Sequence, residues 1–208
     1  MADLEAPADL EATGRFRDFA ALWNESIGLG TPAHHLRIAD FLQRTFESPK
    51  RRGLLLAFRG SGKSSVVALF ICWLLGRDPN TRIAVLSADI ALAKKMVRNV
   101  KRIIESHPAL AFLVPRKPSE WAAGSFTCER SMTLRDPSVM AASIAANFTG
   151  SRADIIVCDD VEVPKNSNTR AKRECLRERL VELEFVLVPG GCQIFIGTPQ
   201  SRDTIYKV

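Results

Sequence analysis

The 208-residue sequence lacks several features that mark specialised classes of protein. It has no apolar run near the length of a membrane-spanning helix, and its acidic N-terminal stretch lacks the hydrophobic region of a signal peptide. It also has no Cys-x-x-Cys pair, no internal repeat and no low-complexity linker. These absences argue against a helical membrane protein, a repeat array and a paired-cysteine motif. The scattered cysteines are instead predicted to be reduced core residues of a cytosolic protein: Cys72, Cys128, Cys158, Cys175 and Cys192.

The composition that remains is that of an ordinary globular protein, with 46% hydrophobic and 25% charged residues. This content supplies one sizeable core. We therefore predict a single domain over residues 14–208, preceded by a flexible acidic tail over residues 1–13. The net charge of +6 permits a polyanionic partner without requiring one.

A glycine-rich turn between two apolar segments is the main chemical landmark. An apolar run at 54–58 leads into Arg-Gly-Ser-Gly-Lys-Ser-Ser at 59–65, and an apolar helical pattern follows at 66–75. This strand–loop–helix context predicts a phosphate-binding P-loop, although Ala57 stands where the pattern normally has glycine. The alternative is a glycine-rich turn that only begins an ordinary helix.

Each residue type in this turn has a predicted role. Gly60 and Gly62 let backbone N–H groups surround phosphate oxygens at the start of the helix. Lys63 is expected to reach the β- and γ-phosphates of ATP, and Ser64 to offer its hydroxyl to Mg²⁺. The full set of predicted contacts in this turn is Arg59, Gly60, Ser61, Gly62, Lys63, Ser64 and Ser65.

A second landmark is the pair of carboxylates that follows Asp154-Ile155-Ile156-Val157-Cys158, a segment that is apolar after its first residue. This segment is typical of a central parallel strand, and ligands bind at the carboxyl ends of such strands. Asp159 is predicted to hold Mg²⁺, and either Asp160 or Glu162 to orient the attacking water as base. The alternative is that the acidic residues simply end a strand.

The third landmark is Gly-Thr-Pro at 197–199, after a predicted strand at 192–196. Thr198 at this strand end is expected either to sense the γ-phosphate region or to couple hydrolysis to movement. The alternative is a turn in which glycine and proline only interrupt the strand.

The remaining pattern alternates strands and helices. Helices are predicted at 16–27, from Pro32 through 42, at 91–104 and over the basic stretch 165–179; strands are predicted at 82–87, 125–134 and 139–144. Such alternation predicts an α/β fold with a mainly parallel sheet flanked by helices on both faces. The basic stretch is either a solvated face or a contact for DNA or another subunit.

Three motifs together resemble one family. AFRGSGKS (57–64), GSRADIIVCDDVEVPKNSNT (150–169) and IFIGTPQS (194–201) occur in the order found in the ATPase half of the large terminase subunit of tailed bacteriophages, most like the short-tailed podophage type. The resemblance implies a P-loop ATPase of the ASCE, RecA-like type. It further implies Mg²⁺-dependent ATP hydrolysis that drives double-stranded DNA into a procapsid.

The resemblance also implies partners and a setting. These are a ring of like subunits, the portal protein and the small terminase subunit, in the host cell cytoplasm with transient docking on the procapsid. An isolated ATPase domain is expected to be mostly monomeric and to have no membrane contact. The nuclease domain of the family is expected to be absent from this chain, and the family's adenine-contacting glutamine is matched only by the nearby Gln43.

Two arginines are candidate catalytic groups. Arg59 lies inside the phosphate loop, where its guanidinium would stabilise charge on the γ-phosphoryl group; the alternative is a surface charge. Arg152 is a candidate arginine finger for a neighbour's nucleotide; the alternative is an ion pair with Asp154 or Glu162.

Two other functions stay open at this stage. One is a nucleic-acid helicase or remodelling ATPase, and the other is a nucleotide-binding module that does not hydrolyse its ligand.

Overall fold

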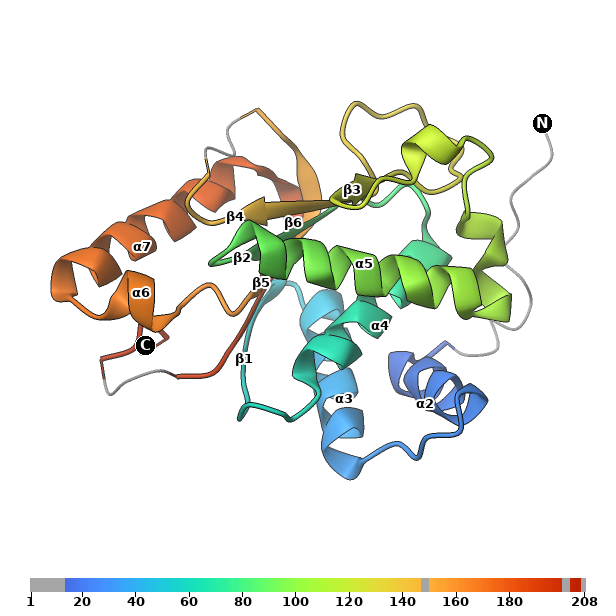
Figure 1. Cartoon of the computed structure of the whole chain (residues 1–208), viewed down its shortest axis with the longest axis horizontal. Helices are drawn as coiled ribbons and strands as arrows, with labels where there is room; N and C mark the ends of the chain where they lie inside the picture. The colour runs from blue at the N-terminus through green and yellow to red at the C-terminus, as the bar shows by residue number, and fades with distance from the viewer. Residues whose placement is uncertain (1–13, 147–149, 200–202, 207–208) are drawn as a thin grey trace.

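A six-stranded sheet with the strand order β1-β6-β5-β2-β4-β3 runs through the centre of the molecule (Figure 1). The computed structural model describes residues 14–146, 150–199 and 203–206, so the predicted tail at 1–13 lies outside the described residues. The strands are β1 (Arg52–Leu56), β2 (Ile83–Ser87), β3 (Ser125–Phe126), β4 (Val139–Ser143), β5 (Ala153–Asp159) and β6 (Leu187–Gly197). All neighbours are parallel except β3 and β4, which confirms the mainly parallel sheet.

Helices cover both faces of this sheet, as predicted. On one face lie α2 (Phe16–Ser26), α3 (Ala33–Glu47), α4 (Lys63–Arg77) and α5 (Ile90–Ser106). On the other face lies α7 (Arg170–Glu182), preceded by the short α6 (Pro164–Ser167). Three 3-10 helices connect these elements: η1 (Pro108–Leu113), η2 (Pro118–Glu120) and η3 (Leu183–Phe185). Among the helices of the described ranges, none combines the length and apolar character needed to cross a membrane.

The apolar pattern of β2 explains why the sheet needs both helical layers. Its side chains alternate between faces, so Ile83 and Val85 enter the cluster beneath α4 and α5, whereas Ala84 and Leu86 enter the cluster beneath α7. All five residues of the strand are buried. A continuous apolar strand of this kind is stable only with cover on both sides.

Parallel pairing brings the three landmark segments to one edge of the sheet. Leu56 at the end of β1 pairs with Gly197 at the end of β6, and Asp159 at the end of β5 pairs with Ile196. The segments that follow these three strands therefore start side by side.

The strand predicted at 125–134 is wrong beyond Phe126. Only Ser125 and Phe126 pair with β4, in antiparallel register. The Arg130 side chain instead donates hydrogen bonds to the carbonyls of Leu134 and Asp136, at 2.9 and 3.1 Å. A guanidinium inside the bend thus takes the carbonyls that a neighbouring strand would otherwise pair with.

The helix predicted over 165–179 is divided. α6 ends at Ser167 and α7 begins after Thr169, whose hydroxyl accepts a hydrogen bond from the backbone N–H of Lys172. A threonine N-cap of this kind starts a new helix. α7 buries only Leu176, so the exposed Cys175 contradicts the prediction of five core cysteines; the other four are buried.

Candidate active site

The loop between β1 and α4 has the backbone of an anion-binding turn. Gly60 and Gly62 have φ angles of +80° and +74°, which residues with a side chain rarely adopt. The Gly62 carbonyl accepts the backbone N–H groups of Ser65 and Val66, at 2.9 and 3.1 Å, and so starts α4. The first N–H groups of a helix have no acceptor within it, and the helix dipole adds positive charge there. A loop with this backbone can bind an anion.

Lys63 connects the loop with two other segments. Its side chain is 6% exposed, and Nζ donates to Thr198 Oγ1 at 3.2 Å and lies 3.7 Å from Asp160 Oδ2. The Thr198 hydroxyl in turn donates to the carbonyl of Ala57 at 2.9 Å. The structure thus brings to one cation a hydroxyl and a carboxylate that each lie nearly 100 residues or more from it in the sequence.

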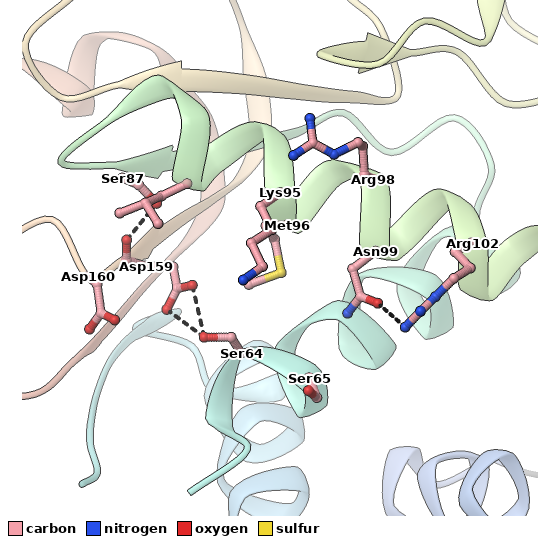
Figure 2. Close-up of a pocket in the computed structure, with 11 residues that line it drawn as sticks. Ser64, Ser65, Ser87, Lys95, Met96, Arg98, Asn99, Arg102, Asp159 and Asp160 are labelled. Carbon is pink, nitrogen blue, oxygen red and sulfur yellow. Dashed lines mark hydrogen bonds between the residues drawn. The ribbon is translucent and has the colours of Figure 1, made fainter. Parts of the chain in front are cut away.

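Ser64 and Asp159 form an oxygen-rich pair (Figure 2). The Ser64 hydroxyl lies 3.1 Å from Asp159 Oδ2 and 3.4 Å from Oδ1, while the Ser87 hydroxyl donates to the Asp159 carbonyl at 2.7 Å. Asp159 is 9% exposed. Burial, followed by the nearby Asp160 carboxylate, raises the Asp159 pKa to about 6, and the Ser64 hydrogen bond and the Lys63 charge oppose that rise.

Asp160 has a strained backbone and a carboxylate that faces the same space. Its φ is +46°, and its N–H donates to the Ile196 carbonyl at 2.9 Å. Oδ1 is buried and has no hydrogen-bond partner among the described residues. A non-glycine residue in this conformation is uncommon, and aspartate tolerates it better than most. The strain aims a carboxylate with an unfilled acceptor beside Lys63.

Glu162, the other candidate base, forms hydrogen bonds with a different segment of the chain. It is 1% exposed, and its carboxylate accepts hydrogen bonds from the Thr204 hydroxyl and from the Ile205 N–H, the latter at 3.1 Å. No feature of the sequence indicates the contact between Glu162 and Thr204, because residues 42 positions apart come together only in the fold. The structure does not group Glu162 with the phosphate loop.

The two candidate arginines lie at different ends of the sheet. Arg59 is exposed within the phosphate loop. Arg152 precedes β5, about 20 Å from Asp159 at the strand rise of ~3.3 Å per residue. Its side chain donates to the carbonyls of Ser151 and Phe185 at 3.1 and 3.2 Å. The alternative prediction, an ion pair of Arg152 with Asp154 or Glu162, is therefore wrong. Within one subunit, Arg152 lies far from the phosphate loop.

A cleft of about 540 Å³ extends from these groups along the space between α4 and α5 (Figure 2). Ser64, Asp159 and Asp160 line one end, and Ser65 lies on the α4 wall. The α5 wall carries three cations that belong to none of the three sequence motifs: Lys95, Arg98 and Arg102. Gln43 is absent from this lining, because its amide accepts from the Phe16 N–H and donates to Glu47.

The raised pKa of Asp159 predicts a pH-dependent stability in the absence of divalent cations. An unfolded aspartate titrates near 3.9, so between about pH 4 and pH 6 the folded state keeps a proton that the unfolded state loses. Stability contributed by this group therefore falls as pH rises through that window, by about 3 kcal/mol in total. The variant Asp159→Asn should match the parent in urea unfolding at pH 4 and exceed it by about 2–3 kcal/mol at pH 7. A difference that stays constant from pH 4 to pH 7 would contradict the effect of burial and of the neighbouring Asp160 carboxylate on the pKa of Asp159.

Comparisons with known proteins find similarity to terminase large subunits. Residues 54–175 match the family model described as terminase large subunit, T4likevirus-type, N-terminal. The chain is 38% identical over 159 residues to the terminase large subunit of Enterobacteria phage T3, covering 76% of this chain and 27% of that protein.

Two solved structures share the fold. The HK97 bacteriophage large terminase aligns with a TM-score of 0.60 and 14% identity, covering 88% of this chain and 37% of that one. A large terminase ATPase domain from Thermus phage P74-26 aligns with a TM-score of 0.50 and 18% identity, covering 88% and 71%. The chain thus spans about a quarter of the T3 relative and about a third of the HK97 structure.

Proposed function

Because the chain belongs to the terminase large subunit family, as the match over residues 54–175 shows, we propose that it hydrolyses ATP as the motor domain of a DNA-packaging terminase. The observation that supports this most directly is the meeting of Lys63, Asp160 and Thr198 at the phosphate loop. These groups supply a cation for the phosphates, a carboxylate for the attacking water and a hydroxyl at the γ-phosphate position. The RecA-like fold of the relatives is in accord with this role.

The residues around Asp159 fit a magnesium ion. Mg²⁺ prefers oxygen ligands and commonly takes one or two carboxylates together with phosphate oxygens. Asp159 and Ser64 place carboxylate and hydroxyl oxygens about one hydrogen bond apart, and burial, followed by the neighbouring Asp160 carboxylate, raises the pKa of Asp159, as expected where a cation would stabilise the charged form. When bound, the ion would neutralise phosphate charge. Ser64 and Asp159 would hold it.

The chain's own residues then divide the work on ATP. Backbone N–H groups at Gly60 and Gly62 bind the phosphates, and Lys63 neutralises the charge that develops on them. Asp160 accepts a hydrogen bond from the attacking water and orients it in line with the γ-phosphorus. Arg59, which is exposed in the loop, stabilises the charge that develops on the γ-phosphoryl group within the same subunit.

A phosphate-release assay separates this proposal from a module that binds nucleotide without turnover. We expect Mg²⁺-dependent release of phosphate from ATP that EDTA abolishes. Tight ATP binding with no release at any protein concentration would favour the non-hydrolysing module. A helicase role predicts unwinding of a duplex with a single-stranded tail, and a packaging motor predicts movement along intact duplex DNA.

The wider role is also part of the proposal. Double-stranded DNA, the portal protein and the small terminase subunit are the partners we propose, in the host cytoplasm and on the procapsid. The basis is the family membership and the similarity to the T3 protein.

Substitution of Arg152 tests whether the subunits act as a ring, in which one subunit contributes to its neighbour's nucleotide site. A second subunit could receive the Arg152 guanidinium that lies far from the phosphate loop of its own chain. Fingers supplied in trans add on the order of 10³ to 10⁵ in rate. Specific activity should therefore rise with protein concentration, and Arg152→Ala should remove the rise while ATP affinity stays near the parental value.

A mixing experiment provides the control. Lys63→Ala subunits that retain Arg152 should rescue Arg152→Ala subunits but not Arg59→Ala subunits, because Arg59 acts within its own loop. Specific activity that is flat from nanomolar to high micromolar protein, with no rescue in the mixture, would exclude a trans role for Arg152.

A further inference from the structure

Two histidines from α3 converge on one backbone oxygen of the phosphate loop. His34 Nε2 lies 3.0 Å from the Ser61 carbonyl oxygen, and His35 Nε2 lies 2.9 Å from the same atom. The two rings meet edge to face with centroids 4.5 Å apart. A carbonyl oxygen has two lone pairs, so two donors can occupy it fully. Because a carbonyl only accepts, each Nε2 carries a proton.

This arrangement sets the orientation of the Ser61–Gly62 peptide. In a trans peptide the carbonyl oxygen and the following N–H point to opposite sides. With the Ser61 oxygen held toward α3, the Gly62 N–H points away from α3. That N–H is one of the groups at the start of α4 that has no acceptor within the helix.

The fit between His35 and Gly62 supports a built contact. A β-carbon added to Gly62 would lie 2.4 Å from His35 Nε2 and 2.8 Å from Cε1. The imidazole thus fills the space of a side chain at a position that already needs a positive φ. The part of α3 that follows these histidines is anchored in the core, because Ile38, Ala39 and Leu42 are buried there.

We propose that His34 and His35 are positioning residues that hold the phosphate loop in its anion-binding conformation, a role that rests on the proposed ATPase function. Neither ring needs to touch the nucleotide. The carbonyl that they hold fixes the peptide, and the peptide presents its N–H to phosphate. Since either histidine alone can hold the carbonyl, the two act redundantly.

Because His34 and His35 act redundantly, single and double variants should differ in a characteristic way. His34→Leu or His35→Leu alone should weaken Mg-ADP binding by about 2- to 5-fold, in the range of one net hydrogen bond. The double variant should weaken it by about 100-fold, more than the product of the singles. The double His→Gln variant keeps an N–H donor on each side chain and should recover binding to within about 5-fold of the parent.

The measurements distinguish positioning from general damage. Titration calorimetry with Mg-ADP gives affinity without turnover, so the result stands whether or not the chain hydrolyses ATP. Arg37→Ala, an exposed change in the same turn of α3, is the matched control and should bind like the parent. Thermal unfolding of each variant reports folding. Equal losses for Leu and Gln double variants, or loss that follows melting temperature alone, would overturn the proposal.

Long-range ¹H–¹⁵N spectra of the parent protein give a test that needs no variant. Both histidines should show the Nε2–H tautomer, with shifts that move little when Mg-ADP binds. An Nδ1–H tautomer at either residue would overturn the proposal, because that ring could not donate to Ser61.

Discussion

Replacing Lys63 by alanine should reduce ATP turnover by about 10³-fold or more and weaken ATP binding by about 10- to 100-fold. The binding loss is that of a charge-assisted hydrogen bond to phosphate. The larger turnover loss follows because charge on the transferred phosphoryl group is stabilised by donors already in place. Lys63 is 6% exposed and held by Thr198, so its ammonium group does not have to be ordered during the reaction.

The control for this prediction is Lys50→Ala, which removes the same charge from an exposed turn before β1. Phosphate release and Mg-ATP titration on both variants check the result. Parental turnover by the Lys63→Ala variant would refute the ATPase assignment as a whole, because Lys63 is the cation that contacts both Thr198 and Asp160 at this loop.

The second large effect is expected at Asp160. Changing it to asparagine should lower turnover by about 10² to 10⁴-fold, the usual contribution of a general base, while Mg-ATP still binds. Asparagine is the appropriate replacement because it tolerates the positive φ of this residue, whereas alanine would add backbone strain. Single-turnover phosphate release and ATP titration, performed together, separate the chemical step from binding.

Glu162→Gln is the matched comparison for Asp160→Asn. Glutamine keeps an oxygen that can accept the Ile205 N–H, so turnover should stay within about 3-fold of the parent and any loss should appear in stability. If the Glu162 variant loses turnover and the Asp160 variant does not, the base assignment is reversed. Full activity of both variants would show that neither carboxylate is the base.

The sequence predicts the central sheet and its helical layers well, because the burial of apolar residues determines which segments form them. β2 and β5 are mostly apolar, and α4 is apolar on nearly every side, so their place in the core follows from composition and length. The bend at 127–136 could not be predicted in this way. Isolated polar contacts hold it, among them the Arg130 guanidinium that binds two carbonyls, and apolar periodicity carries no signal of such contacts.

The candidate site divides along a similar line. Local turn chemistry indicates the roles of Gly60 and Gly62, and their positive φ angles agree with it. Pairing of Lys63 with Asp160, and of Glu162 with Thr204, depends on which strands become neighbours. The His34–His35 contact was equally hidden, since a histidine pair on a helix gives no hint of the carbonyl that it will meet.

The pairing of β1 with β6 has a consequence for how the chain acquires its structure. The Thr198 hydroxyl and the Ala57 carbonyl, which join the segments after these strands, are 141 positions apart, and β1 has no other strand neighbour among the described residues. On the ribosome, β1, the strand that leads into the phosphate loop, cannot join the sheet until β6 has been synthesised. Contacts of such long sequence separation form slowly because the loop between them must close first. Nucleotide binding should therefore appear with the slowest refolding phase, after most helical structure has formed.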